Sequence, residues 1–306
     1  MPARRSCLSV PGSRPRFHEK ADSSAADMVF FDLEDSVARS AKEEAREQVV
    51  EALRTYRYRG KVRGVRVNSV DTRWCADDIR HVVEGAGDRL DCLVIPKVDD
   101  VDAVHFVHHL LNQLEWKLGL ERPIGLELQV ETARGMENSA RVAAASPRNR
   151  TLIFGPVDFA ADMRLPGLGA GDTRPDYPGD LWHYFLARVA VAARAGGLQA
   201  IDGPFLQVRD LAGLRESARR SAALGYDGKW VLHPDQVEVV NEVFSPSQED
   251  FERAHRVIDA YQQATEVEVR GAVMLGDEMI DEASRKLALA TIERGRAAGM
   301  TPRPGS

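Results

Sequence analysis

Short, continuously apolar runs alternate with longer segments of helical periodicity along most of this chain. Such runs, rich in Val, Ile, Leu and Phe, are typical of parallel strands that are covered on both faces. We predict strands at Ser6–Val10, Asp27–Asp32, Val62–Val67, Cys92–Ile95, Gly125–Val130, Thr151–Phe154, Gln199–Ile201 and Lys229–Leu232. Eight strands alternating with helices indicate an α/β fold of the TIM (β/α)8 barrel class.

The pattern changes after the eighth strand, where helical periodicity continues without further strand–helix units. We therefore predict a barrel over residues 1–245, a C-terminal helical extension over 246–300 and a disordered tail over 301–306. Within the extension, helices are predicted at Gln248–Glu266 and Asp277–Arg296. The extension lies outside the repeating unit, so we interpret it as an appendage to the barrel.

One internal segment is too rich in Gly and Pro for regular structure. Met163–Asp180 reads MRLPGLGAGDTRPDYPGD, and we predict a long loop over the barrel mouth there. Its glycines superficially resemble a dinucleotide-binding loop, but they neither follow a strand nor open a helix, so that interpretation is rejected.

Each predicted strand ends at or near a residue able to carry chemistry. These residues are Gly12, Asp32 with Glu34, Arg66, Lys97, Glu131, Asp158, Asp202 and His233. The C-terminal strand ends of a barrel of this kind form its active face. The strand ends therefore mark the expected site.

Glu131 and Asp158 follow adjacent predicted strands, so their carboxylates should converge at the barrel mouth. Mg²⁺ prefers one or two protein carboxylates and leaves its other positions to water or substrate oxygens. The alternative is that each carboxylate caps the helix that follows it. Position alone leaves these two interpretations evenly balanced.

Arg66 ends an apolar strand, where a charged side chain needs a partner. Its planar guanidinium suits a carboxylate or a developing enolate oxygen. A structural ion pair with Glu34 or Asp35 is the alternative, and the pattern does not separate the two. Glu34 and Asp35 themselves are expected to orient metal-bound waters or Arg66 without binding the metal directly.

Basic and imidazole side chains elsewhere carry weaker signals. Arg14 and Lys20 flank the first predicted helix, where phosphates could bind, but from the residues alone ordinary exposed charges are the better interpretation. His105, His108 and His109 lie at helical spacing on an outer helix with nothing acidic to complete a metal site, so we expect them to be solvent-exposed.

Composition excludes several classes of protein. The formal charge of -6 is too mild to indicate a nucleic-acid partner, and no window is apolar enough to span a membrane. Three cysteines without paired spacing indicate neither a disulfide framework nor a zinc site. The N-terminus lacks the apolar core of a signal peptide, so we expect a cytoplasmic protein.

Several motifs together resemble one enzyme family. They read RSCLSVPGSRP, FFDLEDSVA, VRVNSVDT, IPKV, VETARGM, FGPVDFAADM, DGPF and GYDGKWVLHPDQ, in order and with sensible spacing from about residue 5 to residue 285. The series is similar to that of the citrate lyase beta subunit-like group within the HpcH/HpaI aldolases. DLWHYFLARVAVAARAGGLQAIDGPF and NEVFSPS resemble its malyl-CoA lyase branch in particular.

The resemblance implies roles for the residues at the barrel mouth. Glu131 and Asp158 become ligands of Mg²⁺, with Mn²⁺ as a possible substitute, and Arg66 contacts the reacting oxygens of the substrate. Val157 and Asp158 border the substrate. In GDEMID, Asp281 matches the family's catalytic aspartate, which enters the active site of a neighbouring subunit and implies a homotrimer or homohexamer.

The resemblance also implies a binding surface for coenzyme A. Arg14 and Lys20 match positions that contact the coenzyme, and Leu232, His233 and Pro234 match a loop that lines the acyl-CoA channel. The expected partners are therefore an acyl-CoA, a small oxo acid and further copies of this chain.

The implied reaction is a reversible Claisen-type cleavage of a 3-hydroxyacyl-CoA. Malyl-CoA or β-methylmalyl-CoA would give acetyl-CoA or propionyl-CoA plus glyoxylate. A citramalyl-CoA lyase, a malyl-CoA thioesterase and a non-catalytic acyl-CoA-binding subunit are the alternatives. One methyl group in a pocket changes selectivity by only about 1–3 kcal/mol, so the sequence does not identify the oxo acid.

Overall fold

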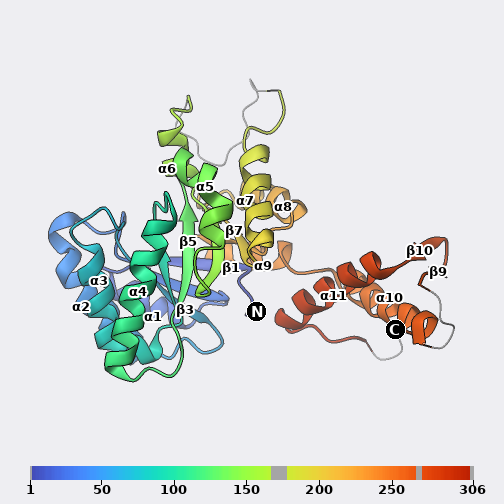
Figure 1. Cartoon of the computed structure of the whole chain (residues 1–306), viewed down its shortest axis with the longest axis horizontal. Coiled ribbons are helices and arrows are strands. Elements are labelled where there is room, and N and C mark those ends of the chain that lie inside the picture. Colours follow the sequence, from blue (N-terminus) through green and yellow to red (C-terminus); the bar gives the residue numbers. More distant parts are fainter. Residues whose placement is uncertain (1, 167–177, 267–270, 304–306) are drawn as a thin grey trace. The chain divides into compact units, whose positions relative to one another are not determined.

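The computed structural model describes residues 2–166, 178–266 and 271–303, and its first unit is a closed barrel (Figure 1). Eight parallel strands pair in sequence order, and β1 closes the barrel against β8. The strands are β1 (Ser6–Pro11), β2 (Met28–Asp32), β3 (Val62–Arg66), β4 (Cys92–Ile95), β5 (Gly125–Val130), β6 (Asn149–Phe154), β7 (Gln199–Asp202) and β8 (Gly228–Val231). The predicted TIM-barrel class is confirmed, with strand ends shifted by at most two residues.

Helices connect the strands and cover the outside of the barrel (Figure 1). They are α1 (Pro15–Asp22), α2 (Lys42–Thr55), α3 (Cys75–Ala86), α4 (Val101–Leu118), α5 (Ala133–Ala143), α6 (Pro156–Asp162), α7 (His183–Ala195), α8 (Leu211–Ala223) and α9 (Asp235–Val243). Short 3-10 turns, η1 (Arg39–Ala41) and η2 (Gly87–Arg89), precede α2 and follow α3. Among the described residues, no helix has both the length and the apolar character needed to cross a bilayer.

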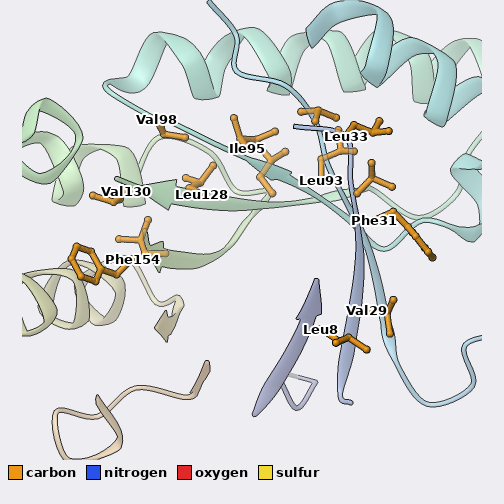
Figure 2. Packing of buried hydrophobic residues seen from close by; sticks show 14 of the residues in the cluster. Leu8, Val29, Phe31, Leu33, Leu93, Ile95, Val98, Leu128, Val130 and Phe154 are labelled. Atoms are coloured by element: carbon orange, nitrogen blue, oxygen red, sulfur yellow. The ribbon is translucent and has the colours of Figure 1, made fainter. Parts of the chain in front are cut away.

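Alternate residues of each strand divide between two hydrophobic layers. The larger layer lies between strands and helices, and Figure 2 shows part of it, with Leu93, Ile95 and Leu128 among its labelled side chains. The smaller layer fills the barrel interior and includes Phe30 and Trp230, whose ring centroids are 4.5 Å apart. Because both layers are closed to water, the polar side chains that can meet substrate are those at or beyond the C-terminal ends of the strands.

Ser245–Ser306, together with Met1–Ala3, form a second compact unit. Its helices α10 (Gln248–Glu266) and α11 (Glu282–Ala297) pack around a small core that includes Phe251 and Ile292. The prediction of α10 is confirmed at both ends.

The predicted helix over Asp277–Arg296 is wrong in its first turn. An antiparallel pair, β9 (Val273–Leu275) and β10 (Glu278–Ile280), precedes α11. Leu275 pairs with Glu278, so Gly276 and Asp277 form a two-residue turn, and Gly276 has a φ of 62°. A glycine at the first turn position permits this tight hairpin, which the apparent helical periodicity concealed.

The structure tests the remaining expectations from the sequence only in part. Most of the predicted loop Met163–Asp180 and the end of the predicted tail lie outside the described residues. On α4, His105 and His109 are exposed as expected. His108 is only partly exposed, because its Nδ1 lies 2.8 Å from the hydroxyl of Ser146.

Candidate active site

Polar side chains gather at the C-terminal mouth of the barrel. All eight strands run parallel, so their C-terminal ends open onto the same face. Asp32 is the last residue of β2 and Arg66 the last of β3, and the two are partners in the strand register. Glu131 follows β5 directly, and Asp158 lies four residues after the end of β6 and three after Gly155, in the first turn of α6.

Arg66 is held by two carboxylates. Its Nε and Nη2 atoms donate to the two carboxylate oxygens of Asp32 at 2.7 Å each, and Nη1 lies 2.9 Å from Glu34 Oε2. The guanidinium also stacks 5.5 Å from the ring centroid of Trp230. A guanidinium carries five N–H donors, so this clamp leaves donors for a substrate oxygen.

The ion pair expected between Arg66 and Glu34 is therefore present, whereas the structure gives Arg66 no contact with Asp35. The principal partner, Asp32, was not assigned a role from the sequence. Burial favours a neutral Arg66, but Asp32 and Glu34 outweigh it and raise the pKa of the guanidinium. The side chain is a fixed positive charge at the mouth.

Glu131 is buried and held by neutral donors. The backbone N–H of Lys97 donates to Glu131 Oε1 at 2.8 Å, and the Gln129 amide donates to Oε2. Burial raises the pKa of Glu131 to about 8; nearby Arg66 opposes this, and Asp158 adds to it. A buried carboxylate near a second carboxylate needs a cation to remain ionised.

Neither acidic residue makes the side-chain cap of the helix that follows it. Thr132, not Glu131, caps α5, because its hydroxyl accepts the backbone N–H of Gly135. Gly155 occupies the cap position of α6, where no side chain caps the helix. Asp158 instead lies 3.6 Å from Lys97 Nζ.

The ammonium group of Lys97 lies close to most of the acidic side chains of the mouth. From the sequence, Lys97 has no role beyond its position at a strand end. Its Nζ lies 2.5 Å from Glu34 Oε1 and 3.6 Å from one carboxylate oxygen each of Asp35 and Asp158. Burial is the largest influence on Glu34 and raises its pKa despite the nearby cations. The motif IPKV, which begins with the last residue of β4, is the sequence signal that could have assigned Lys97 to the site.

The donor set fits a hard divalent cation. Over the residues that the structure describes, no cluster of three or more His, Cys, Asp or Glu side chains is arranged to hold a metal. Mg²⁺ does not need one, because it binds through one or two carboxylates and completes its shell with water or substrate oxygens. Glu131 and Asp158 supply such a pair, and burial, with a smaller contribution from the charge of Asp158, raises the pKa of Glu131.

The structure does not bring all the residues assigned to coenzyme A and substrate to one place. Arg14 precedes α1 and lines a cavity of about 340 Å³, whereas Lys20 lies exposed in the last turn of α1 and does not line it. Val157 is exposed beside Asp158.

The predicted channel loop follows β8. Leu232 is exposed, and its backbone N–H donates to Gln236 Oε1 at 2.8 Å. His233 and Pro234 are exposed, and the N–H of Asp235 donates to His233 Nδ1 at 3.2 Å. All three predicted residues are thus available to a ligand at the end of a barrel strand.

Asp281 belongs to the C-terminal unit and caps α11. Its Oδ1 accepts the backbone N–H of Ser284 at 3.0 Å, and the Ser284 hydroxyl lies 3.2 Å away. The backbone hydrogen bond from Ser284 is the main reason why the pKa of Asp281 lies below its usual value.

Comparisons with known proteins relate the chain to a family of lyases. The HpcH/HpaI aldolase/citrate lyase profile matches residues 5–234. An L-malyl-CoA/beta-methylmalyl-CoA lyase of Cereibacter sphaeroides is 40% identical over 92% of this chain and 91% of that protein. A (3S)-malyl-CoA thioesterase of the same species is 36% identical over 96% of this chain and 95% of its own length.

A solved structure adds ligands to the comparison. Protein CitE from Mycobacterium tuberculosis, in complex with magnesium, acetoacetate and coenzyme A, has a TM-score of 0.73 and 27% identity, and the match covers 96% of this chain and 98% of that one. The family profile spans all eight barrel strands. This chain belongs to the HpcH/HpaI aldolase/citrate lyase family.

Proposed function

We propose that this chain is a Mg²⁺-dependent carbon–carbon lyase that reversibly cleaves malyl-CoA or β-methylmalyl-CoA to glyoxylate and acetyl-CoA or propionyl-CoA. The observation that carries this proposal is the placement of Arg66, Glu131 and Asp158 at one barrel mouth. The identity of 40% to an enzyme named L-malyl-CoA/beta-methylmalyl-CoA lyase supports the choice of substrate.

Glu131 and Asp158 would hold the metal. Bound there, Mg²⁺ or Mn²⁺ supplies Lewis-acid stabilisation of negative charge on the oxygens of the hydroxy acid or oxo acid. The Lys97 N–H and the Gln129 amide fix the orientation of the Glu131 carboxylate. A carboxylate whose orientation is already fixed by hydrogen bonds needs little rearrangement to bind the metal ion.

Arg66 is proposed to stabilise the thioester enolate. Breaking the carbon–carbon bond leaves negative charge on the thioester oxygen, and a preorganised cation lowers the free energy of that state. Asp32 holds the guanidinium through two hydrogen bonds of 2.7 Å, so its direction is set before the substrate binds. The donors that neither Asp32 nor Glu34 uses would face the enolate oxygen.

Asp281 is proposed as the proton donor to the enolate carbon, and as the acceptor of a methyl proton in the synthetic direction. In the structure it caps α11 and its pKa is lowered, which makes it a weak base in that state. Catalysis therefore requires Asp281 to exchange its contacts with Ser284 for contacts with substrate. We place this residue in the site of a neighbouring subunit, in a homotrimer or homohexamer.

Coenzyme A is proposed to contact Arg14, Lys20 and the loop Leu232–Pro234. Arg14 lies beside the cavity at the start of α1, where a permanently charged side chain can pair with phosphate. Leu232 is exposed and is proposed to give the acyl chain an apolar contact. Val157, beside the metal ligand Asp158, is proposed to border the acid portion of the substrate.

The cysteines support a reducing compartment, for which we propose the cytoplasm. Cys7, Cys75 and Cys92 are all free and buried. Burial raises the pKa of each thiol, so none is an activated nucleophile.

A thioesterase is the second candidate, because a relative of that name is 36% identical over nearly the whole chain. The same site would then release malate by admitting water to the thioester. Trapping glyoxylate as its phenylhydrazone and titrating free thiol in parallel separates the two reactions. Phenylhydrazone formation indicates the lyase, whereas free coenzyme A without glyoxylate indicates the thioesterase.

The decisive experiment compares malyl-CoA, β-methylmalyl-CoA and citramalyl-CoA with and without Mg²⁺. We expect cleavage that stops on chelation and in the variant Asp158→Ala, whereas the control Asp77→Ala, an exposed residue of α3, retains it. Undiminished rates after chelation would contradict the metal assignment. No turnover with any of these esters would favour the non-catalytic acyl-CoA-binding subunit.

A further inference from the structure

Lys97 lies in the middle of the acidic mouth, yet the proposed reaction assigns it no step. Its Nζ lies 2.5 Å from Glu34, 3.6 Å from Asp35 and 3.6 Å from Asp158. These three carboxylates come from two different strand–helix loops, and Lys97 comes from a third. The ammonium group therefore compensates the negative charge of these three carboxylates. Within the part of the chain that the structure describes, no other lysine forms an ion pair with them.

We propose that Lys97 is a built-in counter-ion of the metal site, whose ammonium group neutralises the mouth while Mg²⁺ is absent and withdraws from Asp158 when Mg²⁺ binds. The inference rests on the proposed function, because it takes Glu131 and Asp158 as the metal ligands. It makes Lys97 a positioning residue that controls the affinity and timing of metal binding.

Competition for Asp158 is the first argument. The ammonium nitrogen and a divalent ion are both attracted to the carboxylate of Asp158, which is itself about one-third exposed. Two cations at one partly desolvated carboxylate repel each other strongly. One of the two cations must therefore move away from Asp158. We expect the ammonium group to move, because it carries one charge and Mg²⁺ carries two.

The side chain of Lys97 can move away from Asp158. It is 32% exposed and carries a flexible four-carbon stem. Its shortest contact is with Glu34, not with Asp158, so it can leave Asp158 while keeping its best partner. Withdrawal toward Glu34 and Asp35 costs one contact of 3.6 Å and returns Asp158 to the metal.

The backbone of Lys97 has a separate and constant role. Its N–H donates to Glu131 Oε1, and its φ of 51° is uncommon for a residue with a side chain. This conformation aims the N–H at a metal ligand and the ammonium at the acidic cluster. A variant that tests the charge must keep a side chain of similar length and leave the backbone alone, which points to Lys97→Met.

The test measures Mg²⁺ binding by calorimetry in the absence of substrate. We expect Lys97→Met to bind Mg²⁺ with a Kd lower by about tenfold, because the competing charge is gone. Without metal, its melting temperature should fall below that of the wild type, and Mg²⁺ should raise it by more. Lys117→Met, which removes a lysine that pairs with Glu84 on the outer helices, is the matched control and should change neither quantity.

An unchanged or higher Kd in Lys97→Met would overturn the inference. If wild-type Mg²⁺ binding is saturable and is lost in Asp158→Ala, such a result leaves the proposed metal site intact. Absence of saturable binding in the wild type would instead overturn both proposals.

A second measurement needs no variant and covers the case in which Lys97→Met does not fold. Acetylation of lysines in the wild type, followed by mass spectrometry, reports how accessible each amine is. We expect Mg²⁺ to raise the labelling rate of Lys97 severalfold relative to that of Lys117. A rate that stays constant or falls with Mg²⁺ would show that the ammonium does not withdraw.

Discussion

The clamp between Asp32 and Arg66 offers the sharpest test of the site. Asp32 is buried and accepts from Arg66 through both oxygens. Oδ1 also accepts the backbone N–H of Glu34 at 2.9 Å, and Oδ2 that of Ser36 at 3.2 Å. In Asp32→Asn, whichever oxygen becomes an NH2 group must face one guanidinium N–H and one backbone N–H. No flip of the amide removes this conflict.

The expected magnitude follows from burial. Removing one charge of a buried ion pair costs about 3–5 kcal/mol, because the other charge loses its compensation. Glu34 remains 2.9 Å from Arg66, so we expect the lower end, about 3 kcal/mol. At about 2 °C per kcal/mol for a chain of this size, the melting temperature should fall by roughly 6 °C. A displaced Arg66 should lower kcat by about 10²-fold.

The assay combines thermal melting with malyl-CoA cleavage, and β3 provides a matched control. Arg63, near the start of β3, makes the same forked contact with Asp91, at 2.9 and 3.0 Å, but both side chains are partly exposed. Asp91→Asn should therefore cost little stability and no activity. If Asp32→Asn keeps its kcat, or melts no lower than Asp91→Asn, the clamp does not position Arg66.

Three further predictions concern other parts of the molecule. Asp281→Asn should keep the stability of α11, because Asn caps helices as well as Asp does, while kcat collapses; an unchanged kcat would assign Asp281 to capping alone. Gly155→Ala should weaken Mg²⁺ binding measured by calorimetry, because the added Cβ would overlap the Glu131 carboxylate; an unchanged Kd would remove Glu131 from the metal site. Burial lowers the pKa of His18 below 6.5, so the unfolded chain binds its proton first as the pH falls. The free energy of unfolding should therefore fall as the pH drops below about 6.5. This fall should be less steep in His18→Gln, and as steep as in the wild type in the exposed control His105→Gln. Equal slopes in all three proteins would refute the prediction.

The barrel was predictable because its signal is local and repeated. Each strand is a short apolar run, each helix shows its own periodicity, and eight repetitions make the alternation hard to mistake. Parallel strands then bring their C-terminal residues to one mouth without any knowledge of side-chain contacts. That reasoning alone placed Arg66, Glu131 and Asp158 on the same face.

The hairpin of β9 and β10 was not predictable in the same way. GDEMID carries polar residues at helical spacing, and only the positive φ of Gly276 turns the chain back on itself. A two-residue turn is decided by the pairing of the strands on either side of it, and three-residue strands leave almost no periodic pattern.

The sequence by itself therefore determined the fold class and which residue types meet at the barrel mouth. Only the tertiary structure decided how they pair: Arg66 with Asp32, and Lys97 with Glu34 in preference to Asp158. Partner choice depends on distances of a few ångströms between side chains on different strands, and on how far burial strengthens each charge. These quantities arise from closure of the barrel and have no counterpart in the order of residues along the chain.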